Sequence, residues 1–129
     1  MAKTVLKTIQ NKAVIEITLD AAGSETIDLQ TDVLCASQAV SGATQEVDID
    51  SVKFSVQPTQ LATVTRNSVN VLQLYGVDHW QFDGYSINQQ NTSDIVVTLA
   101  GAGTVILELA KKSGYTTTVP NVGVSKEAP

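Results

Sequence analysis

The chain has 129 residues, of which 43% are apolar and 16% are charged, and its formal net charge is −5. This length predicts one domain, which buries roughly two-thirds of its unfolded surface and needs neither a disulfide nor a metal to fold. The eight basic residues are spread along the chain, whereas nucleic-acid-binding proteins concentrate Lys and Arg on one face. Composition therefore argues against nucleic acid or an anionic membrane as a partner.

The chain carries no sign of export. Cys35 is the only cysteine, which excludes an intramolecular disulfide. The first residues, Met-Ala-Lys-Thr-Val-Leu-Lys, lack the long apolar segment of a secretory signal peptide. No run of about 18 apolar residues predicts a membrane helix. We therefore expect a protein that is made and folded in the cytoplasm.

Apolar residues at every second position predict β-strands from the N-terminus onward. The first strands cover residues 4–9 and 12–19, joined by a turn at Gln10-Asn11, and the next covers residues 25–31. Residues 32–39 form the one candidate helix. A helix of this length is marginal, so we prefer a strand end followed by a loop.

A long strand is predicted at residues 45–56, and its phase changes near the middle. Val47 and Ile49 share one phase, whereas Phe54 and its apolar neighbours take the other. The change near Asp50 predicts a β-bulge, or a strand that bends between two sheets.

Two hairpins are predicted in the second half of the chain. The first joins residues 62–66 to residues 69–75 across Asn67-Ser68. The second covers residues 94–110, where two β-branched runs flank Ala-Gly-Ala-Gly at 100–103. Its glycines tolerate the positive φ that a tight hairpin needs.

Short strands separated by turn residues at regular spacing predict an all-β fold. We expect a β-sandwich, Ig-like or jelly-roll-like, of about eight or nine short antiparallel strands over residues 1–115. After this the alternation fades, and two prolines and one glycine follow. Residues 116–129 are therefore expected to form an extended C-terminal arm.

His79, the only histidine, is the one candidate general base, with Asp78 and Asp83 nearby in sequence. A general base needs a nucleophile or a polarised substrate within hydrogen-bond reach. The sequence has no Gly-x-Ser-x-Gly and no motif around Cys35. A loop histidine beside Trp80 is the better interpretation, and we expect no catalytic residues and no cofactor.

Three carboxylates alternate along one strand: Glu46, Asp48 and Asp50. Oxygen ligands of this kind suit Ca²⁺, but the loop spacing Asp-x-Asp-x-Asp-Gly is absent. Like charges at every second position are also typical of a solvated face that protects a sheet edge. We favour the solvated face and predict no metal site, while the question of a bound cation stays open.

Four aromatic residues lie within eleven positions: Tyr75, Trp80, Phe82 and Tyr85. Exposed aromatics can hold a sugar ring or a partner protein. Trp80 and Phe82 are in phase, however, which favours a shared core face.

The C-terminal arm has a functional interpretation too, because an arm can pair with a neighbouring subunit as an added strand; a loose terminus is the alternative. The residues predicted to contact a partner are Tyr75, Trp80, Tyr85, Tyr115, Val119, Val122 and Val124.

Several segments carry a family resemblance. They are Trp-Gln-Phe-Asp-Gly-Tyr at 80–85, Asn-Thr-Ser-Asp-Ile-Val-Val-Thr at 91–98, Gly-Thr-Val-Ile-Leu-Glu-Leu at 103–109, Ser-Gly-Tyr at 113–115, Asp-Ile-Asp-Ser-Val-Lys-Phe at 48–54 and Val-Thr-Arg at 64–66. Together they cover about the last two-thirds of the chain. The chain resembles small β-rich virion structural proteins of tailed bacteriophages, particularly those of marine cyanobacterial phages. The matching motifs are structural, so no active-site residues carry over.

The resemblance implies a non-enzymatic virion protein, present in many copies or as a homo-oligomer and assembled in the host bacterial cytoplasm. Capsid decoration is the first expectation, with the major capsid protein or other virion proteins as partners. A neck, tail or fibre-attachment component is the second. Strand edges and the arm would make the contacts, and many weak contacts add through multivalency. A carbohydrate- or receptor-binding module that uses Tyr75, Trp80 and Tyr85 is the alternative. Position on the particle and symmetry stay open.

Overall fold

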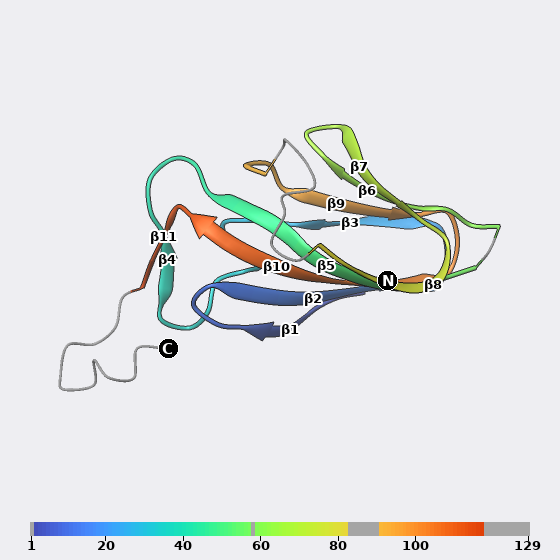
Figure 1. Cartoon of the computed structure of the whole chain (residues 1–129), viewed down its shortest axis with the longest axis horizontal. Coiled ribbons are helices and arrows are strands. Elements are labelled where there is room, and N and C mark those ends of the chain that lie inside the picture. The colour runs from blue at the N-terminus through green and yellow to red at the C-terminus, as the bar shows by residue number, and fades with distance from the viewer. Residues whose placement is uncertain (1, 58, 83–90, 118–129) are drawn as a thin grey trace.

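A computed structural model describes residues 2–57, 59–82 and 91–117 of the protein (Figure 1). This described part contains eleven strands and no helix, which confirms the all-β class. The strands are β1 (Ala2–Thr8), β2 (Lys12–Leu19), β3 (Gly23–Ile27), β4 (Gln38–Val40), β5 (Glu46–Val56), β6 (Ala62–Arg66), β7 (Val69–Leu74), β8 (Gly76–Gln81), β9 (Ile95–Leu99), β10 (Gly103–Ser113) and β11 (Tyr115–Thr117).

Two larger sheets hold nine of these strands, and a small ribbon holds the other two. The first sheet has the order β1-β2-β10-β5-β8, the second has the order β3-β9-β6-β7, and β11 pairs with β4. All the pairs between described strands are antiparallel. In Figure 1 the two larger sheets form two layers, with the ribbon of β4 and β11 at one end.

One apolar core lies between the two layers. In β2 the residues alternate strictly between buried and half-buried positions, which is the pattern of a strand with one face in the core. Ile15 and Ile17 of this strand, Val64 of β6, Val97 of β9 and Leu107 of β10 are all 0% exposed. The core therefore draws on both sheets, as the alternating sequence predicted.

The predicted hairpin at residues 94–110 is wrong. β9 pairs with β3 and β6, whereas β10 pairs with β2 and β5, so the two strands lie in different sheets. Residues 100–102 cross from one layer to the other. Two successive runs that each bury one face in the same core look like a hairpin in sequence, because periodicity does not reveal the pairing partner.

The glycines of this crossover meet a steric need. The described glycines with positive φ are Gly42, Gly76 and Gly114, and none of them belongs to this segment. A Cβ on Gly103 would instead lie 2.8 Å from Leu99 Cδ2, and a Cβ on Gly101 would lie 2.8 Å from Gln60 Oε1. Glycine at position 103 lets the crossover pack closely against buried Leu99 and the backbone of Ser55, whereas at position 101 the nearest atoms belong to the flexible side chain of Gln60, which can move aside.

The bulge near Asp50 and the turn at Asn67-Ser68 are both confirmed. Glu108 pairs with Ser51 and Leu109 with Ile49, so Asp50 is the extra residue of β5. Asn67 and Ser68 have φ angles of 52° and 63°, and they join the paired strands β6 and β7. Positive φ at both turn residues is the requirement of a type I′ hairpin turn.

The segment at 32–39 is not a helix, as preferred, but the expected strand end followed by a loop is wrong: β3 ends at Ile27, and the segment is a loop that leads into β4. Its turns include hydrogen bonds from Asp32 N to Asp28 O at 2.9 Å and from Gln38 N to Cys35 O at 3.0 Å. At the other end of the chain, Thr116 and Thr117 pair with β4. The first two residues of the expected arm are therefore strand, and the rest of the arm lies outside the described residues.

Candidate interaction surface

Four connections between the two sheets meet at one end of the molecule. Register places the C-terminal ends of β2, β5, β7 and β9 beside the N-terminal ends of β3, β6, β8 and β10. We call this end, formed by residues 20–22, 57, 59–61, 75 and 100–102, the connection end. It lies at the right of Figure 1.

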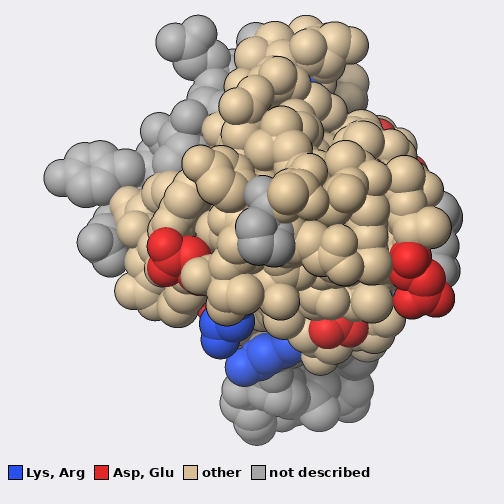
Figure 2. All heavy atoms as spheres, turned by 90° about the vertical axis from the view of Figure 1, so that its right-hand side faces the viewer, with Lys and Arg blue, Asp and Glu red and all other residues tan. Residues whose placement is uncertain are grey.

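The connection end is poor in charge. Asp20 is the single charged residue in the sequence of these four connections. Figure 2 faces this end, and the middle of the view carries no acidic or basic side chain among the described residues. Acidic and basic side chains appear toward the sides and the lower part of the same view, so the charge-poor area is confined to the connections themselves.

Large apolar side chains are exposed at this end. Tyr75 is 66% exposed, Leu61 is 40% exposed, and Val77, next to the connection in β8, is 79% exposed. Leu61 and Tyr75 flank the paired residues Ala62 and Leu74, so they lie side by side. The backbone N–H of Ala100 donates to the carbonyl of Leu61 at 3.0 Å, which fixes the crossover against this patch.

Val77 also borders a shallow hollow on the outer face of the first sheet. The hollow has a volume of about 480 Å³, and its lining includes the charged residues Lys53 and Asp78 besides Val77, Phe54, Ser55, His79, Thr104 and Ile106. The apolar surface of the connection end thus continues a short way along β8 and β10.

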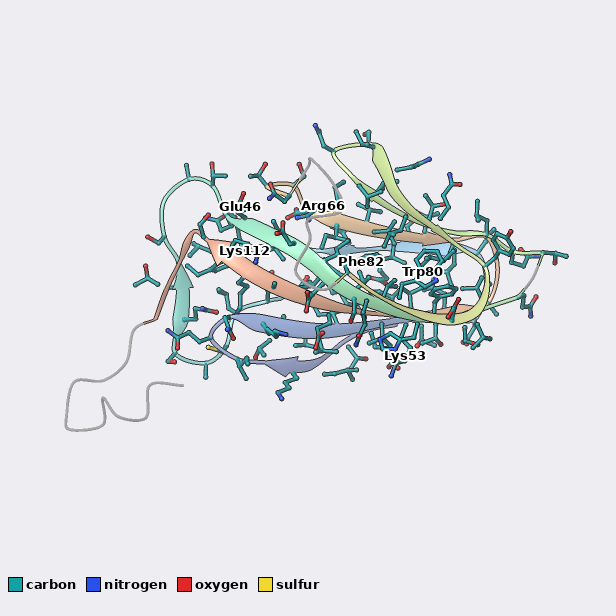
Figure 3. The ribbon with its side chains drawn as sticks, viewed as in Figure 1. Glu46, Lys53, Arg66, Trp80, Phe82 and Lys112 are labelled. Carbon is teal, nitrogen blue, oxygen red and sulfur yellow. The ribbon has the colours of Figure 1, made fainter. Side chains whose placement is uncertain are left out.

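The predicted partner contacts among the aromatic residues have different environments. Tyr75 is the most exposed of those described. Trp80 packs edge-to-face on Phe54, with ring centroids 5.2 Å apart, and Trp80 and Phe82 both lie against the core. Their predicted core face is therefore confirmed, and Figure 3 shows both of them on the β8 side of the molecule. Tyr85 lies outside the described residues.

Tyr115 is held in place by its neighbours. Its hydroxyl donates a hydrogen bond to the carbonyl of Leu29 at 2.7 Å, and burial raises the pKa of the phenol above its ordinary value of 10. This contact ties β11 to the loop after β3. The other predicted contacts of the arm, at Val119, Val122 and Val124, lie outside the described residues.

The edge strands of the first sheet are poor templates for a partner strand. In β1, Val5 pairs with Ile15 and Lys7 with Val14, so Leu6 is an extra residue that interrupts the ladder. At the other edge, the Asp78 carboxylate accepts the backbone N–H of His79 at 2.8 Å. Bulges and charged side chains at an edge both oppose the addition of another strand.

The edge strands of the second sheet are interrupted in the same two ways. In β7 the register slips at Val71, since Val64 pairs with Leu72 and Thr65 with Asn70. In β3 the edge is covered by Lys3, whose ammonium donates to the carbonyl of Thr26 at 2.8 Å. The same ammonium lies 2.8 Å from Asp32 Oδ2. Contacts through strand edges, expected from the sequence, thus have little physical support.

The opposite end of the molecule contains the sole arginine of the chain, Arg66, and this side chain is 0% exposed. Its guanidinium donates to the carbonyls of Ser93 at 2.7 and 3.0 Å, of Asn91 at 3.0 Å and of Val47. Burial lowers its pKa from 12.5 to about 10, against the opposing effect of Asp48 and Asp94. Arg66 therefore joins β6 to β5 and to the segment before β9.

Lys111 is a second buried cation at this end, 8% exposed. Its ammonium donates to the carbonyl of Val33 at 2.6 Å and to Gln38 Oε1, and it lies 5.6 Å from the centre of the Tyr115 ring. Burial lowers the pKa of Lys111, and Cys35 acts in the opposite sense. Lys111 thus holds the ribbon of β4 and β11 against the first sheet.

The prediction that Glu46, Asp48 and Asp50 lie on one solvated face is wrong for Asp48. Asp48 is 8% exposed, and Asn91 Nδ2 donates to Asp48 Oδ1 at 3.0 Å and to Glu46 Oε2 at 2.8 Å. Asp50 lies 3.4 Å from the ammonium of Lys12. Asn91 packs against Glu46 and Asp48 through these hydrogen bonds, and the bulge shifts only Asp50, so the three carboxylates do not share one exposed face.

His79 and Asp78 do not form a dyad in the contacts of the described residues. The two carboxylate oxygens of Asp78 accept the backbone N–H of His79 and the indole N–H of Trp80, and neither contact involves the imidazole. Asp83, the other carboxylate considered for this role, lies outside the described residues. Cys35, the one thiol of the chain, is buried.

Sequence reasoning missed the two buried cations and the exposed Leu61 and Val77. A signal for the cations was present: Arg66 continues the apolar phase of Ala62 and Val64, and Lys111 likewise continues that of β10. For the exposed residues the signal was the near absence of charge in the inter-sheet connections.

No group of His, Cys, Asp or Glu residues in the described ranges is arranged to hold a metal ion. Nor does this part of the chain include a helix with the length and apolarity to cross a membrane. Comparison with protein-family models, with curated proteins and with solved structures found no match.

Proposed function

We propose that this protein is a non-enzymatic structural component of a tailed-bacteriophage virion and that it decorates the capsid. The observation that carries the proposal is the connection end, with its exposed apolar residues and its single acidic residue. A charge-poor apolar patch on a protein surface is typical of a protein–protein contact site. The virion itself is proposed from the family resemblance.

In this proposal the two larger sheets act as a rigid support, and the connection end makes the contact with virion proteins. The connections are short, and each one is fixed by a strand at both ends. A surface of this kind changes little on binding, so little entropy is lost in ordering it. The partner is the major capsid protein or another virion protein, further copies of this chain included, and no nucleic acid or membrane is involved.

Within the same class, a neck, tail or fibre-attachment component is the second candidate. It would use the same contact surface at a different place on the particle. A carbohydrate- or receptor-binding module has weaker support, because such a module needs an exposed aromatic platform. Trp80 packs on Phe54, and this leaves Tyr75 as the main exposed ring among the described aromatics.

The test is the location of the protein in purified virions of the phage that encodes it. Gold-labelled antibody against the recombinant chain is expected to label the capsid surface at many positions per particle. Label confined to the neck or tail would favour the second candidate. Presence of the protein in infected cells but not in purified virions would contradict the proposal.

A further inference from the structure

We infer that the occupant of the connection end is a second copy of this chain, related by a two-fold axis. The inference rests on the proposed function, because it uses the same contact surface. What it adds is the identity of the immediate partner at that surface.

The electrostatics of the chain favour this face for self-association. Each copy carries a net charge of −5, so two copies repel each other when faces rich in carboxylates approach. Asp28, Asp32, Glu46, Asp48 and Asp94 all lie toward the opposite end, around the loops that precede β4, β5 and β9. At the connection end Asp20 is the single charge in the connections, and Asp78 follows the exposed Val77 in β8, so two copies meet there with less repulsion than at the opposite end.

Symmetry favours the same conclusion. In a two-fold dimer the same patch contacts itself, so a charged group there would face its own like charge or need an opposite partner nearby. The connection end has one such group, Asp20, and the apolar remainder of the patch is complementary to itself without either condition. Tyr75 offers a large aromatic anchor, a residue type enriched in the energetic centres of interfaces, and the small exposed side chains of Ala21, Ala22 and Ala100 allow close approach.

The other route to self-association, through strand edges, is obstructed. The four edge strands are bulged at Leu6 and Val71 or capped by Lys3 and Asp78. The connection end is therefore the face on which apolar exposure, low charge and freedom from such obstruction coincide.

The dimer is expected to be weak. A standard interface buries about 800 Å² per partner, roughly an eighth of the 6678 Å² of accessible surface. The exposed Leu61, Tyr75 and Val77 supply only a part of that area. Association is therefore expected to grow with protein concentration, and to grow with salt as well, because salt screens the repulsion between the two acidic copies.

The test is sedimentation equilibrium of the full chain over a wide range of concentrations. The variant Tyr75→Lys/Val77→Lys is compared with Val69→Lys/Asn70→Lys, a control pair of exposed residues beside the turn after β6. Both variants change the net charge equally, and both make it less negative, so greater general repulsion cannot explain a loss of association. Circular dichroism confirms that each variant is folded.

Wild type and control are expected to associate alike, and the connection-end variant is expected to associate at least about tenfold more weakly, the effect of losing one anchor. The inference is overturned by a wild type that is monomeric at all concentrations, or by equal loss of association in both variants. Binding of the same proteins to purified virions separates the two proposals. A monomeric wild type whose virion binding is lost in the connection-end variant refutes the dimer and supports the proposed function. A dimer that binds no virion supports the inferred dimer and refutes the proposed function.

Discussion

Replacing Arg66 by methionine tests how the buried cation contributes to stability. The side chain is 0% exposed and makes four hydrogen bonds, which end on three carbonyls. Methionine has a similar length but no donor. The variant therefore leaves the carbonyls of Val47, Asn91 and Ser93 without these contacts while it keeps most of the packing.

Two opposing effects set the magnitude. Hydrogen bonds from a charged group contribute at least about 1.5 kcal/mol each, so the four bonds of Arg66 stabilise the fold by about 6 kcal/mol. Burial acts against the charged form, since it lowers the pKa of Arg66 from 12.5 to about 10, so the net stabilisation is smaller than this sum. Three carbonyls lose their donor at a cost of at least about 1 kcal/mol each, so Arg66→Met is expected to destabilise the protein by about 3 kcal/mol.

Urea unfolding followed by the fluorescence of Trp80, the only tryptophan, measures this difference. Lys53→Met is the control, because Lys53 is exposed on β5 and a surface change of this kind shifts stability by less than about 0.5 kcal/mol. An Arg66→Met variant as stable as wild type, or more stable, would refute the reasoning. It would mean that the desolvation of the guanidinium outweighs its hydrogen bonds, as happens in some buried ion pairs.

Three further changes test other parts of the structure. Gly103→Ala is expected to destabilise by about 1–2 kcal/mol, measured by urea unfolding, because the added Cβ would lie 2.8 Å from the Cδ2 of buried Leu99; no loss would contradict the close packing of the crossover. Ser68→Gly is expected to raise the free energy of unfolding by about 0.5 kcal/mol, since Ser68 has a φ of 63°. The melting temperature should therefore rise slightly, and a lower melting temperature would count against the turn. Tyr115→Phe is expected to cost about 1 kcal/mol at neutral pH through loss of the bond to Leu29. Burial raises the pKa of Tyr115 above 10, so above pH 10 the unfolded chain releases this proton first and wild type loses stability. The gap between the two proteins should therefore narrow as pH rises above 10, and a constant gap would refute the assigned burial.

Local pattern was enough to predict much of the fold. The alternation in β2 predicted its buried face, the phase change in β5 predicted the bulge at Asp50, and Asn67-Ser68 predicted a tight turn. Each of these features depends on the residues at that point of the chain. For that reason they can be read without knowing which strands are neighbours.

Features that depend on pairing between distant segments were not predictable in this way. β9 and β10 have the alternation of a hairpin, yet their partners come from both halves of the chain. The burial of Arg66 depends on the carbonyls of residues 91 and 93, which reach it only after the sheets assemble. The connection end likewise exists only because the topology gathers four connections in one place.

Hydrogen exchange of the protein in purified virions, compared with the free chain at low concentration, tests the central claim most directly. Backbone amides of residues 57, 59–61 and 75–77 are expected to exchange more slowly in the virion, because the connection end is covered there by protein. The amides of residues 67–69, at the turn between β6 and β7, are expected to exchange equally in both states. Slower exchange at residues 67–69 with no change at the connection end would contradict the account.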